Sequence, residues 1–337
     1  MTSGPAAAAL AAALSCAATG ALAWLARRRG WLDHPGARRM HIDPTPRVGG
    51  AALLVGLLPL LWATPARGAA IVVALFFAVG LADDIAHGRR GVPAWAKLCL
   101  QVAAGIVAVA FLDVRFAGRA SGPWGTVDLA AAAPVMTVLW FVAVVNLVNF
   151  TDGIDGISAA TGAVFLGAAA GAGGPASDLA WGGLGALAGF AVWNAPPARA
   201  FLGDGGSHLL GALVALGPCS GAGVAPGETL PWALAAAPLV PTIVDVGAAL
   251  VRKVRRGIPL ATPHDDHLYQ RLVKAGDSPL FVAFRYGALA LAGVLLAGPV
   301  ARRFGVPLAV FAGGTLLLVH LLAGARRAAA VPRTLAP

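Results

Sequence analysis

Carboxylate, amide and histidine side chains gather in a few short segments of this sequence, mostly at the ends of long apolar stretches. The first segment is an adjacent acid pair, Asp83 and Asp84, which directly follows the apolar residues 68–82. Adjacent carboxylates at a membrane boundary can hold a divalent cation, or one can act as a base while the other holds the metal. A solvated helix end explains the pair equally well when it is taken alone.

The second segment combines amides and carboxylates at three-residue steps: Asn146, Asn149, Asp152 and Asp155. This spacing places successive polar groups on one face if the preceding apolar helix continues through Asp152. Four such groups at membrane depth are costly unless they serve a purpose. We therefore expect this segment to take part in binding or catalysis.

The third segment, residues 201–208, surrounds the single acid Asp204 with glycines and opens the next apolar stretch. Such a sequence suits a diphosphate, because backbone N–H groups and the positive end of a helix face the anion while Asp204 holds a bridging Mg²⁺. It is not a Walker A motif, because no Gly-Lys-Ser/Thr follows. A simple glycine-rich turn is the alternative interpretation.

The fourth segment lies in a long basic loop and carries His264, His267 and Arg271. Two histidines without a cysteine make a weak zinc site, and histidine with arginine is better suited to a substrate phosphate. A short interfacial amphipathic helix, with Leu268 and Leu272 facing lipid, is a compatible structural role.

The fifth segment joins the first two apolar stretches and contains His41 and Arg47. Its prolines stiffen the chain and exclude helix, so the loop can hold both side chains in place. On its own this segment is an ordinary turn.

The elements that position these segments are membrane helices. The composition of 58% hydrophobic and 12% charged residues lies outside the range of soluble domains. Apolar stretches recur along all 337 residues, without the alternation of a β-barrel. We predict an all-α, polytopic bundle forming one catalytic domain over residues 1–337. About eleven spans are expected, at 5–26, 48–64, 68–82, 95–112, 129–147, 157–171, 179–194, 207–224, 230–250, 280–298 and 304–322.

The distribution of basic residues predicts the orientation of the bundle. The first apolar stretch has three arginines after it and none before it, which indicates a retained span with the N-terminus outside. The loops that then fall inside carry most of the lysines and arginines, and an odd number of spans places the C-terminus in the cytoplasm. This pattern explains the net charge of +10 better than nucleic-acid binding does. All five chemical segments lie on the inside face.

Taken in order, these motifs resemble the polyprenyl-phosphate N-acetylhexosamine-1-phosphate transferase family. The resemblance runs from about His41 to Leu272 and rests on Pro-Thr-Pro-Arg47 with the two following glycines, the acid pair, the Asn149–Gly156 motif and the Phe201–Ser207 motif. It implies a bacterial cytoplasmic-membrane enzyme with its active site on the cytoplasmic face. The implied reaction transfers sugar phosphate from a UDP-N-acetylhexosamine to undecaprenyl phosphate, releases UMP and uses Mg²⁺ or Mn²⁺.

By the same resemblance, Asp204 is the main metal ligand, assisted by Asp155, and Asp83 or Asp84 is the base or the acid that positions the acceptor. Asp152 and Asp155 complete the catalytic carboxylates. The substrate-binding positions are His41, Arg47, Asn146, Asn149, Gly205, Ser207, His264, His267 and Arg271. A homodimer is one possible assembly.

Two departures from the family pattern bear on the branch. The last inside loop reads His264-Asp-Asp-His267, where the peptidoglycan-lipid enzymes have adjacent histidines, and this favours the branch that initiates O-antigen or lipopolysaccharide synthesis. The lysine that often follows the acid pair is not obvious, and Lys97 is a distant candidate. The rival interpretations are a transporter with polar intramembrane residues and a scaffold that binds anionic lipid through its basic loops.

Overall fold

The computed structural model describes residues 4–35, 40, 42–64, 66–86, 91–116, 119–122, 125–128, 130–171, 175–220, 236–259, 262 and 266–304. Most of them are helical, as predicted. The helices are α1 (Gly4–Arg29), α2 (Gly49–Ala63), α3 (Arg67–Ala86), α4 (Ala94–Phe111), α5 (Ala133–Thr151), α6 (Ile157–Gly171), α7 (Pro175–Asn194), α8 (Gly203–Ala215), α10 (Val240–Arg255), α11 (Leu268–Lys274) and α12 (Pro279–Phe304), with a 3₁₀ helix η2 (Ala237–Leu239).

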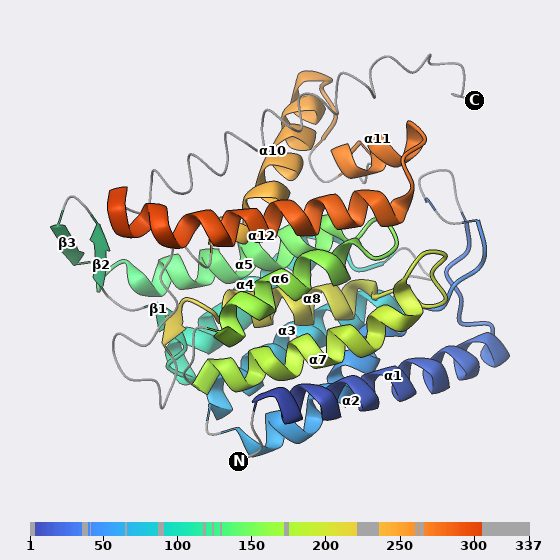
Figure 1. The fold of residues 1–337 in the computed structure, drawn as a ribbon, viewed down its shortest axis with the longest axis horizontal. Coiled ribbons are helices and arrows are strands. Elements are labelled where there is room, and N and C mark those ends of the chain that lie inside the picture. Colours follow the sequence, from blue (N-terminus) through green and yellow to red (C-terminus); the bar gives the residue numbers. More distant parts are fainter. Residues whose placement is uncertain are drawn as a thin grey trace.

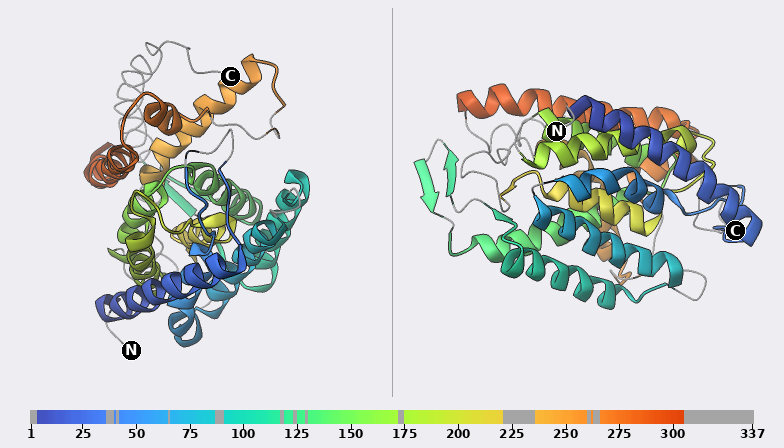
Figure 2. Two further views of the ribbon diagram at one scale, coloured as in Figure 1. Left: turned by 90° about the vertical axis from the view of Figure 1, so that its right-hand side faces the viewer. Right: turned by 90° about the horizontal axis from the view of Figure 1, so that it is seen from below.

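Most helices run side by side along the long axis of the molecule, with α8 at the centre (Figures 1 and 2). Helices α2, α3, α5, α6 and α7 all contact α8. Every residue from Gly205 to Ala215 is buried, so α8 is a core helix with no face for lipid. Its 13 residues extend about 20 Å, less than the ~30 Å hydrocarbon core of a bilayer.

The predicted span 207–224 is therefore wrong in its extent. Helix α8 begins earlier, at Gly203, and ends at Ala215. Gly217 and Pro218 follow the helix, and proline lacks the backbone N–H that a further turn needs. This signal was present in the sequence but hidden within a long apolar run.

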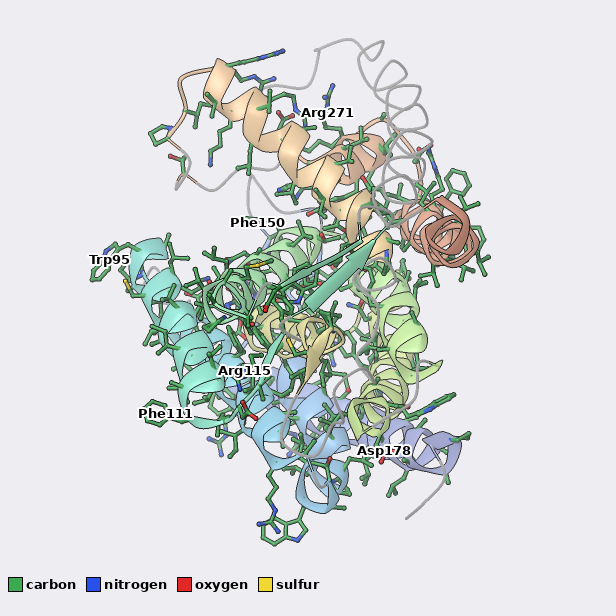
Figure 3. The ribbon with its side chains drawn as sticks, turned by 90° about the vertical axis from the view of Figure 1, so that its left-hand side faces the viewer. Trp95, Phe111, Arg115, Phe150, Asp178 and Arg271 are labelled. Atoms are coloured by element: carbon green, nitrogen blue, oxygen red, sulfur yellow. The ribbon has the colours of Figure 1, made fainter. Side chains whose placement is uncertain are left out.

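The long apolar helices are consistent with a helical membrane protein. Within the described part of the chain, five helices are long and apolar enough to cross a bilayer: α1, α3, α4, α5 and α12. Large apolar side chains cover their outer faces; Trp95 and Phe111 project outward from the two ends of α4 (Figure 3) and are 73% and 78% exposed. Lipid would cover such a surface. The predicted last span, 304–322, lies outside the described residues apart from Phe304, the last residue of α12.

Close helix packing fixes the first turn of α8 against α2 and α3. A side chain at Gly80 of α3 would collide with the carbonyl of Asp204, and one at Gly50 of α2 would collide with the backbone of Gly206. Only glycine permits this approach. The first turn of α8 therefore lies directly against the backbones of α2 and α3.

The all-α expectation needs one correction. Among the described residues, four short strands occur near the end of the bundle opposite the polar segments: β1 (Arg115–Phe116), β2 (Arg119–Gly122), β3 (Gly125–Asp128) and β4 (Cys219–Ser220). β2 pairs with β3 as a hairpin, and β1 pairs antiparallel with β4 (Figure 1). β1, β2 and β3 thus lie in a stretch predicted only as a connection, whereas β4 lies within the predicted span 207–224.

Helix α10 rises out of the bundle at an angle, with α11 beside it (Figure 1). Leu268 and Leu272 of α11 are 5% and 3% exposed and pack in a second apolar cluster with Tyr269, Tyr286 and Val282. The expectation that these leucines face lipid is wrong, because α12 and the loop after α5 cover them.

Candidate active site

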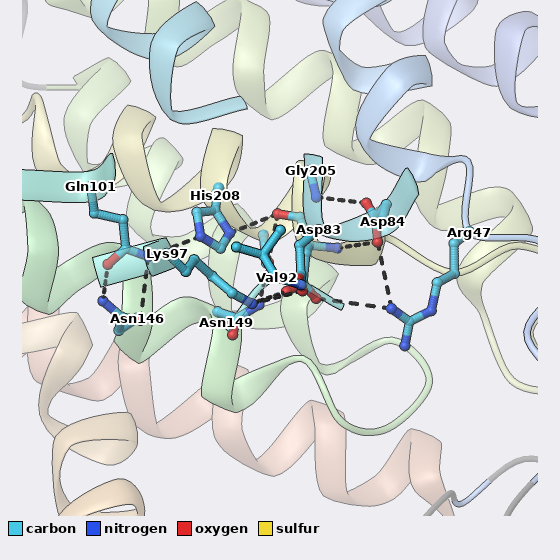
Figure 4. A network of polar contacts seen from close by, with 12 residues as sticks. Arg47, Asp83, Asp84, Val92, Lys97, Gln101, Asn146, Asn149, Gly205 and His208 are labelled. Carbon is cyan, nitrogen blue, oxygen red and sulfur yellow. Dashed lines mark hydrogen bonds and ion pairs between the residues drawn. The ribbon is translucent and has the colours of Figure 1, made fainter. Parts of the chain in front are cut away.

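The ammonium group of Lys97 joins two carboxylates that are far apart in the sequence. Its Nζ lies 2.7 Å from Asp83 Oδ2 at the end of α3 and 2.7 Å from Asp204 Oδ2 in the first turn of α8 (Figure 4). Asp83 also accepts the backbone N–H of Val92, at 2.6 Å. Because the Lys97 side chain is 18% exposed, these are partly desolvated, charge-assisted contacts.

The neighbouring Asp84 has a different set of partners. Its Oδ1 accepts the backbone N–H of Asp204 at 3.0 Å, and its Oδ2 accepts that of Gly205 at 2.8 Å. Asp84 therefore caps the first turn of α8 from another helix, where an anion also meets the positive end of the helix dipole. These two N–H groups were expected to face a diphosphate, but they are occupied by Asp84.

Arg47 is the second cation of the site. Its Nη1 lies 3.5 Å from Asp84 Oδ1 and 4.0 Å from Asp204 Oδ1, while its Nε donates to Asp33 Oδ2 at 3.1 Å. The backbone around Arg47 is held against the α7–α8 loop, because Gly49 N–H donates to the Phe201 carbonyl at 2.9 Å. These backbone contacts hold the loop that carries Arg47 beside Asp84.

The Asn149–Asp155 segment does not continue as a helix. Helix α5 ends at Thr151, and Asp152 caps it with ψ of 59°, so the condition for a single helical face through Asp152 is not met. Asn149 Nδ2 donates to Ser207 Oγ at 2.9 Å, and Ser207 donates to the Asp204 carbonyl at 3.1 Å. Asp155 accepts the backbone N–H of Ala198 at 2.9 Å. Each side chain thus ties the end of α5 to a different neighbour.

Asp152 lies where α5 ends, and the pKa of its carboxyl is raised. Burial raises the pKa of this carboxyl to about 7, and the hydrogen bond from Ser158, at 2.7 Å, opposes the shift only in part. Asp152 therefore changes charge near neutral pH.

A polar cavity of about 230 Å³ opens among these elements. Its lining includes five of the predicted site residues, namely Arg47, Asn149, Asp152, Asp155 and Asp204. The other lining residues are Asp33, Met40, Gly153, Ile154, Asn194, Phe201, Leu202, Gly203 and Gln270. Asp83 and Asp84 adjoin this lining through their contacts with Asp204.

Asn146 lies one turn deeper and is not part of this lining. Its Nδ2 donates to Gln101 Oε1 at 2.6 Å, and Gln101 Nε2 lies 2.9 Å from His208 Nε2. His208 Nδ1 lies 2.8 Å from the Asp204 carbonyl, which can only accept. Nδ1 therefore carries the proton, and the hydrogen-bonded series Asn146–Gln101–His208 ends at the backbone carbonyl of Asp204.

Of the predicted residues His264, His267 and Arg271, the structure describes His267 and Arg271. His267 is 4% exposed, stacks between the rings of Phe150 and Tyr269, and has its Nδ1 3.6 Å from Asp245 Oδ1. Arg271 lies 3.9 Å from Asp266. Neither lines the cavity. His41 and His264 lie outside the described residues.

Asp33, Gln101 and Asp245 were not singled out from the sequence, and His208 was included only as the last residue of segment 201–208. Asp245 is 2% exposed and accepts hydrogen bonds from Leu268 N–H at 2.7 Å and Tyr286 Oη–H at 2.6 Å. Tyr269 Oη–H in turn donates to the Phe150 carbonyl at 2.8 Å. An isolated acid inside a predicted span, as Asp245 is in 230–250, was the available signal, because such residues are rare.

The donor set is suited to a hard cation. Mg²⁺ is usually bound by one or two carboxylates together with substrate phosphates. The carboxylates of Asp204 and Asp83 converge on Lys97, and Asp204 and Asp155 line the cavity. In the described ranges no group of three or more His, Cys, Asp or Glu side chains surrounds a common point. The carboxylates of Asp204, Asp83 and Asp155 are thus of the kind that could hold a Mg²⁺ shared with a substrate phosphate.

Known proteins match this chain over most of its length. Residues 66–220 match glycosyl transferase family 4. The decaprenyl-phosphate N-acetylglucosaminephosphotransferase of Mycobacterium tuberculosis (strain CDC 1551 / Oshkosh) is 30% identical over 308 residues, covering 80% of this chain and 75% of that protein. A probable undecaprenyl-phosphate N-acetylglucosaminyl 1-phosphate transferase of Bacillus subtilis (strain 168) is 28% identical over 281 residues, covering 75% and 73%.

A third relative, the phospho-N-acetylmuramoyl-pentapeptide-transferase of Streptococcus thermophilus (strain ATCC BAA-250 / LMG 18311), is 33% identical over 213 residues, or 54% of this chain and 62% of that protein. The family match at residues 66–220 includes the acid pair, Lys97, the Asn149–Asp155 segment and Asp204. With these motifs gathered around one polar cavity, the chain belongs to glycosyl transferase family 4 and is a glycosyl-1-phosphate transferase.

Proposed function

We propose that this protein transfers N-acetylhexosamine 1-phosphate from a UDP-sugar to undecaprenyl phosphate and releases UMP. The observation that carries the proposal is the contact of Lys97 with both Asp83 and Asp204, beside a polar cavity lined by Arg47. Two cations and several carboxylates at one end of a membrane bundle suit a reaction between two phosphate-bearing substrates, one soluble and one in the lipid.

Each charged residue has a role in this proposal. Arg47 and Lys97 bind phosphate oxygens and stabilise the charge that builds up during transfer. Asp204 would hold Mg²⁺ with Asp155, and the metal would supply charge neutralisation at the diphosphate. Asp83 orients Lys97. A general base is not needed, because a phosphate monoester is already largely ionised near neutral pH.

The finer assignments are also proposals. The mycobacterial and Bacillus subtilis relatives described above are named for N-acetylglucosamine and for decaprenyl or undecaprenyl phosphate, which supports N-acetylglucosamine as the first donor to test. We place the reaction at the cytoplasmic face of the bacterial inner membrane, on the basis of the basic inside loops. We propose that it initiates a cell-envelope glycan, such as O-antigen of lipopolysaccharide.

A direct assay tests the proposal. Purified full-length protein is incubated with Mg²⁺, a panel of UDP-N-acetylhexosamines, and undecaprenyl or decaprenyl phosphate, and UMP is measured. We expect lipid-dependent UMP release with at least one donor, and its loss in Asp204→Asn. Failure of every donor and lipid pair, in protein that retains its thermal unfolding transition, contradicts the proposal. Transport activity that survives Asp204→Asn would favour the carrier interpretation instead.

A further inference from the structure

A groove of about 540 Å³ lies between the ends of α1 and α7, apart from the polar cavity. It is lined by Gly20, Trp24, Arg27, Arg28 and Trp193. A side chain at Gly20 would come within 2.7 Å of the Trp193 ring, so this glycine leaves the space that the indole occupies. The groove thus has an apolar wall and a basic rim, and its volume is typical of small-molecule sites.

The arginines of the rim are held by the protein but keep their charge available. The Arg28 guanidinium lies 4.0 Å from the centre of the Trp24 ring, and Arg27 Nη2 donates to the Arg199 carbonyl at 2.7 Å. Arg199 lies over Trp193 at 4.7 Å. Within the described residues no carboxylate pairs with Arg27 or Arg28, so both can attract an anion.

The position of the groove indicates the kind of anion. Helix α1 is a candidate membrane span, and its last turn carries the arginines. Tryptophan and arginine at the end of a span lie at the level of the lipid headgroups. A soluble phosphate would gain nothing from the indole wall, whereas a phospholipid places its phosphate and its acyl chain in this order along the groove.

We propose that this groove binds one anionic phospholipid, of the phosphatidylglycerol class. Its phosphate lies between Arg27 and Arg28, and its upper acyl chain lies against Trp193 and Gly20. The inference does not depend on the reaction proposed above. It has a structural link to the cavity, since Arg27 holds the Arg199 carbonyl and the adjacent Ala198 N–H donates to Asp155.

Lipid retention tests the proposal. Full-length protein is reconstituted in vesicles of phosphatidylcholine with a minor fraction of phosphatidylglycerol, extracted in mild detergent, and examined by native mass spectrometry. We expect wild-type protein to retain phosphatidylglycerol in preference to phosphatidylcholine. Each of Arg27→Gln and Arg28→Gln should lower that preference by about fivefold, which is the contribution of one basic residue at an anionic surface.

Arg29→Gln is the matched control, because Arg29 is in the same turn and lies 5.8 Å from the Trp31 ring, outside the groove. We expect it to retain the wild-type preference. Equal losses in Arg28→Gln and Arg29→Gln would show general attraction to the membrane surface and overturn the proposal. Displacement of phosphatidylglycerol by an equimolar amount of undecaprenyl phosphate would overturn it in favour of the polyprenyl lipid. Trp193→Phe keeps an apolar ring in the wall of the groove and should preserve retention of phosphatidylglycerol.

Discussion

The carboxylate of Asp84 accepts the backbone N–H of Gly205, 2.8 Å away, so that one helix caps another. This contact separates the roles of two adjacent acids that sequence alone leaves equivalent. Asp83 faces Lys97, whereas Asp84 faces the backbone of α8.

The first prediction concerns this separation. Asp84→Ala removes the acceptor of two backbone N–H groups and should lower the free energy of unfolding by about 1–3 kcal/mol per orphaned group. Asp83→Ala removes one backbone acceptor and should destabilise less. Thermal unfolding of both variants in detergent checks this, and a larger loss in Asp83→Ala would contradict it.

The second prediction concerns Lys97. Lys97→Met should lower the rate of UMP release by about 10²–10³, the usual effect of removing one preorganised charge stabiliser. Lys97→Arg keeps the charge but not the compact geometry, and should recover part of the activity. Lys274→Met, on the exposed side of α11, is the matched control. If Lys97→Met retains full activity, Lys97 has only a structural role.

The third prediction concerns the Asp33–Arg47 pair. Asp33→Asn weakens the contact at Arg47 Nε and leaves the guanidinium in place but less well oriented. We expect a fall in kcat/KM of about tenfold, mainly through KM, since one charge-assisted hydrogen bond is weakened. Arg47→Gln should cost more. Steady-state kinetics for both substrates measures the difference, and a fall confined to kcat would contradict it.

The fourth prediction concerns pH. Burial raises the pKa of Asp152 to about 7 in the folded protein, from roughly 4 in the unfolded chain. Between these values the folded state holds a proton that the unfolded state has lost, so stability falls as pH rises, by up to ~1.4 kcal/mol per pH unit. Asp152→Asn should flatten this slope in thermal unfolding between about pH 5 and pH 7, which is roughly the span of the pKa shift. An unchanged slope would show that other groups dominate.

The fifth prediction concerns Asp245 as a positioning residue. It holds the start of α11 through two backbone N–H groups, and Gln270 of that helix lines the cavity. Asp245→Ala should increase hydrogen exchange in α11 and raise KM, while exchange in α3 stays unchanged. Tyr286→Phe removes only one of the bonds to Asp245 and should have a smaller effect. Equal exchange in α11 of Asp245→Ala and the wild type would contradict this role.

The helices and their polar ends were predictable because apolar length and charge position are local properties. The placement of Asp83, Asp152 and Asp204 at helix ends follows from where apolar stretches stop. The end of α8 was also readable from Gly217 and Pro218, but a hydropathy criterion that looks for about 20 apolar residues passes over it.

The partners of these residues were not predictable from one sequence. Lys97 and Asp204 are 107 positions apart, and no spacing rule joins them. The same holds for Asp245 and Tyr286, which meet only because α10 and α12 pack together. The sequence left open whether the helix continues through Asp152, and the chain in fact leaves the helix at Thr151, one residue before that acid.

The shortness of α8 has a consequence for how the protein is made. A segment of 13 residues is shorter than the ~20 apolar residues that a span needs, and α8 also carries Asp204 and His208, so it is a poor candidate for independent insertion. Its neighbours α3 and α5 contact it along its length. We therefore expect α8 to enter the bilayer late in biogenesis, as part of a hairpin with α7 that the translocon releases into a site already prepared by the preceding helices.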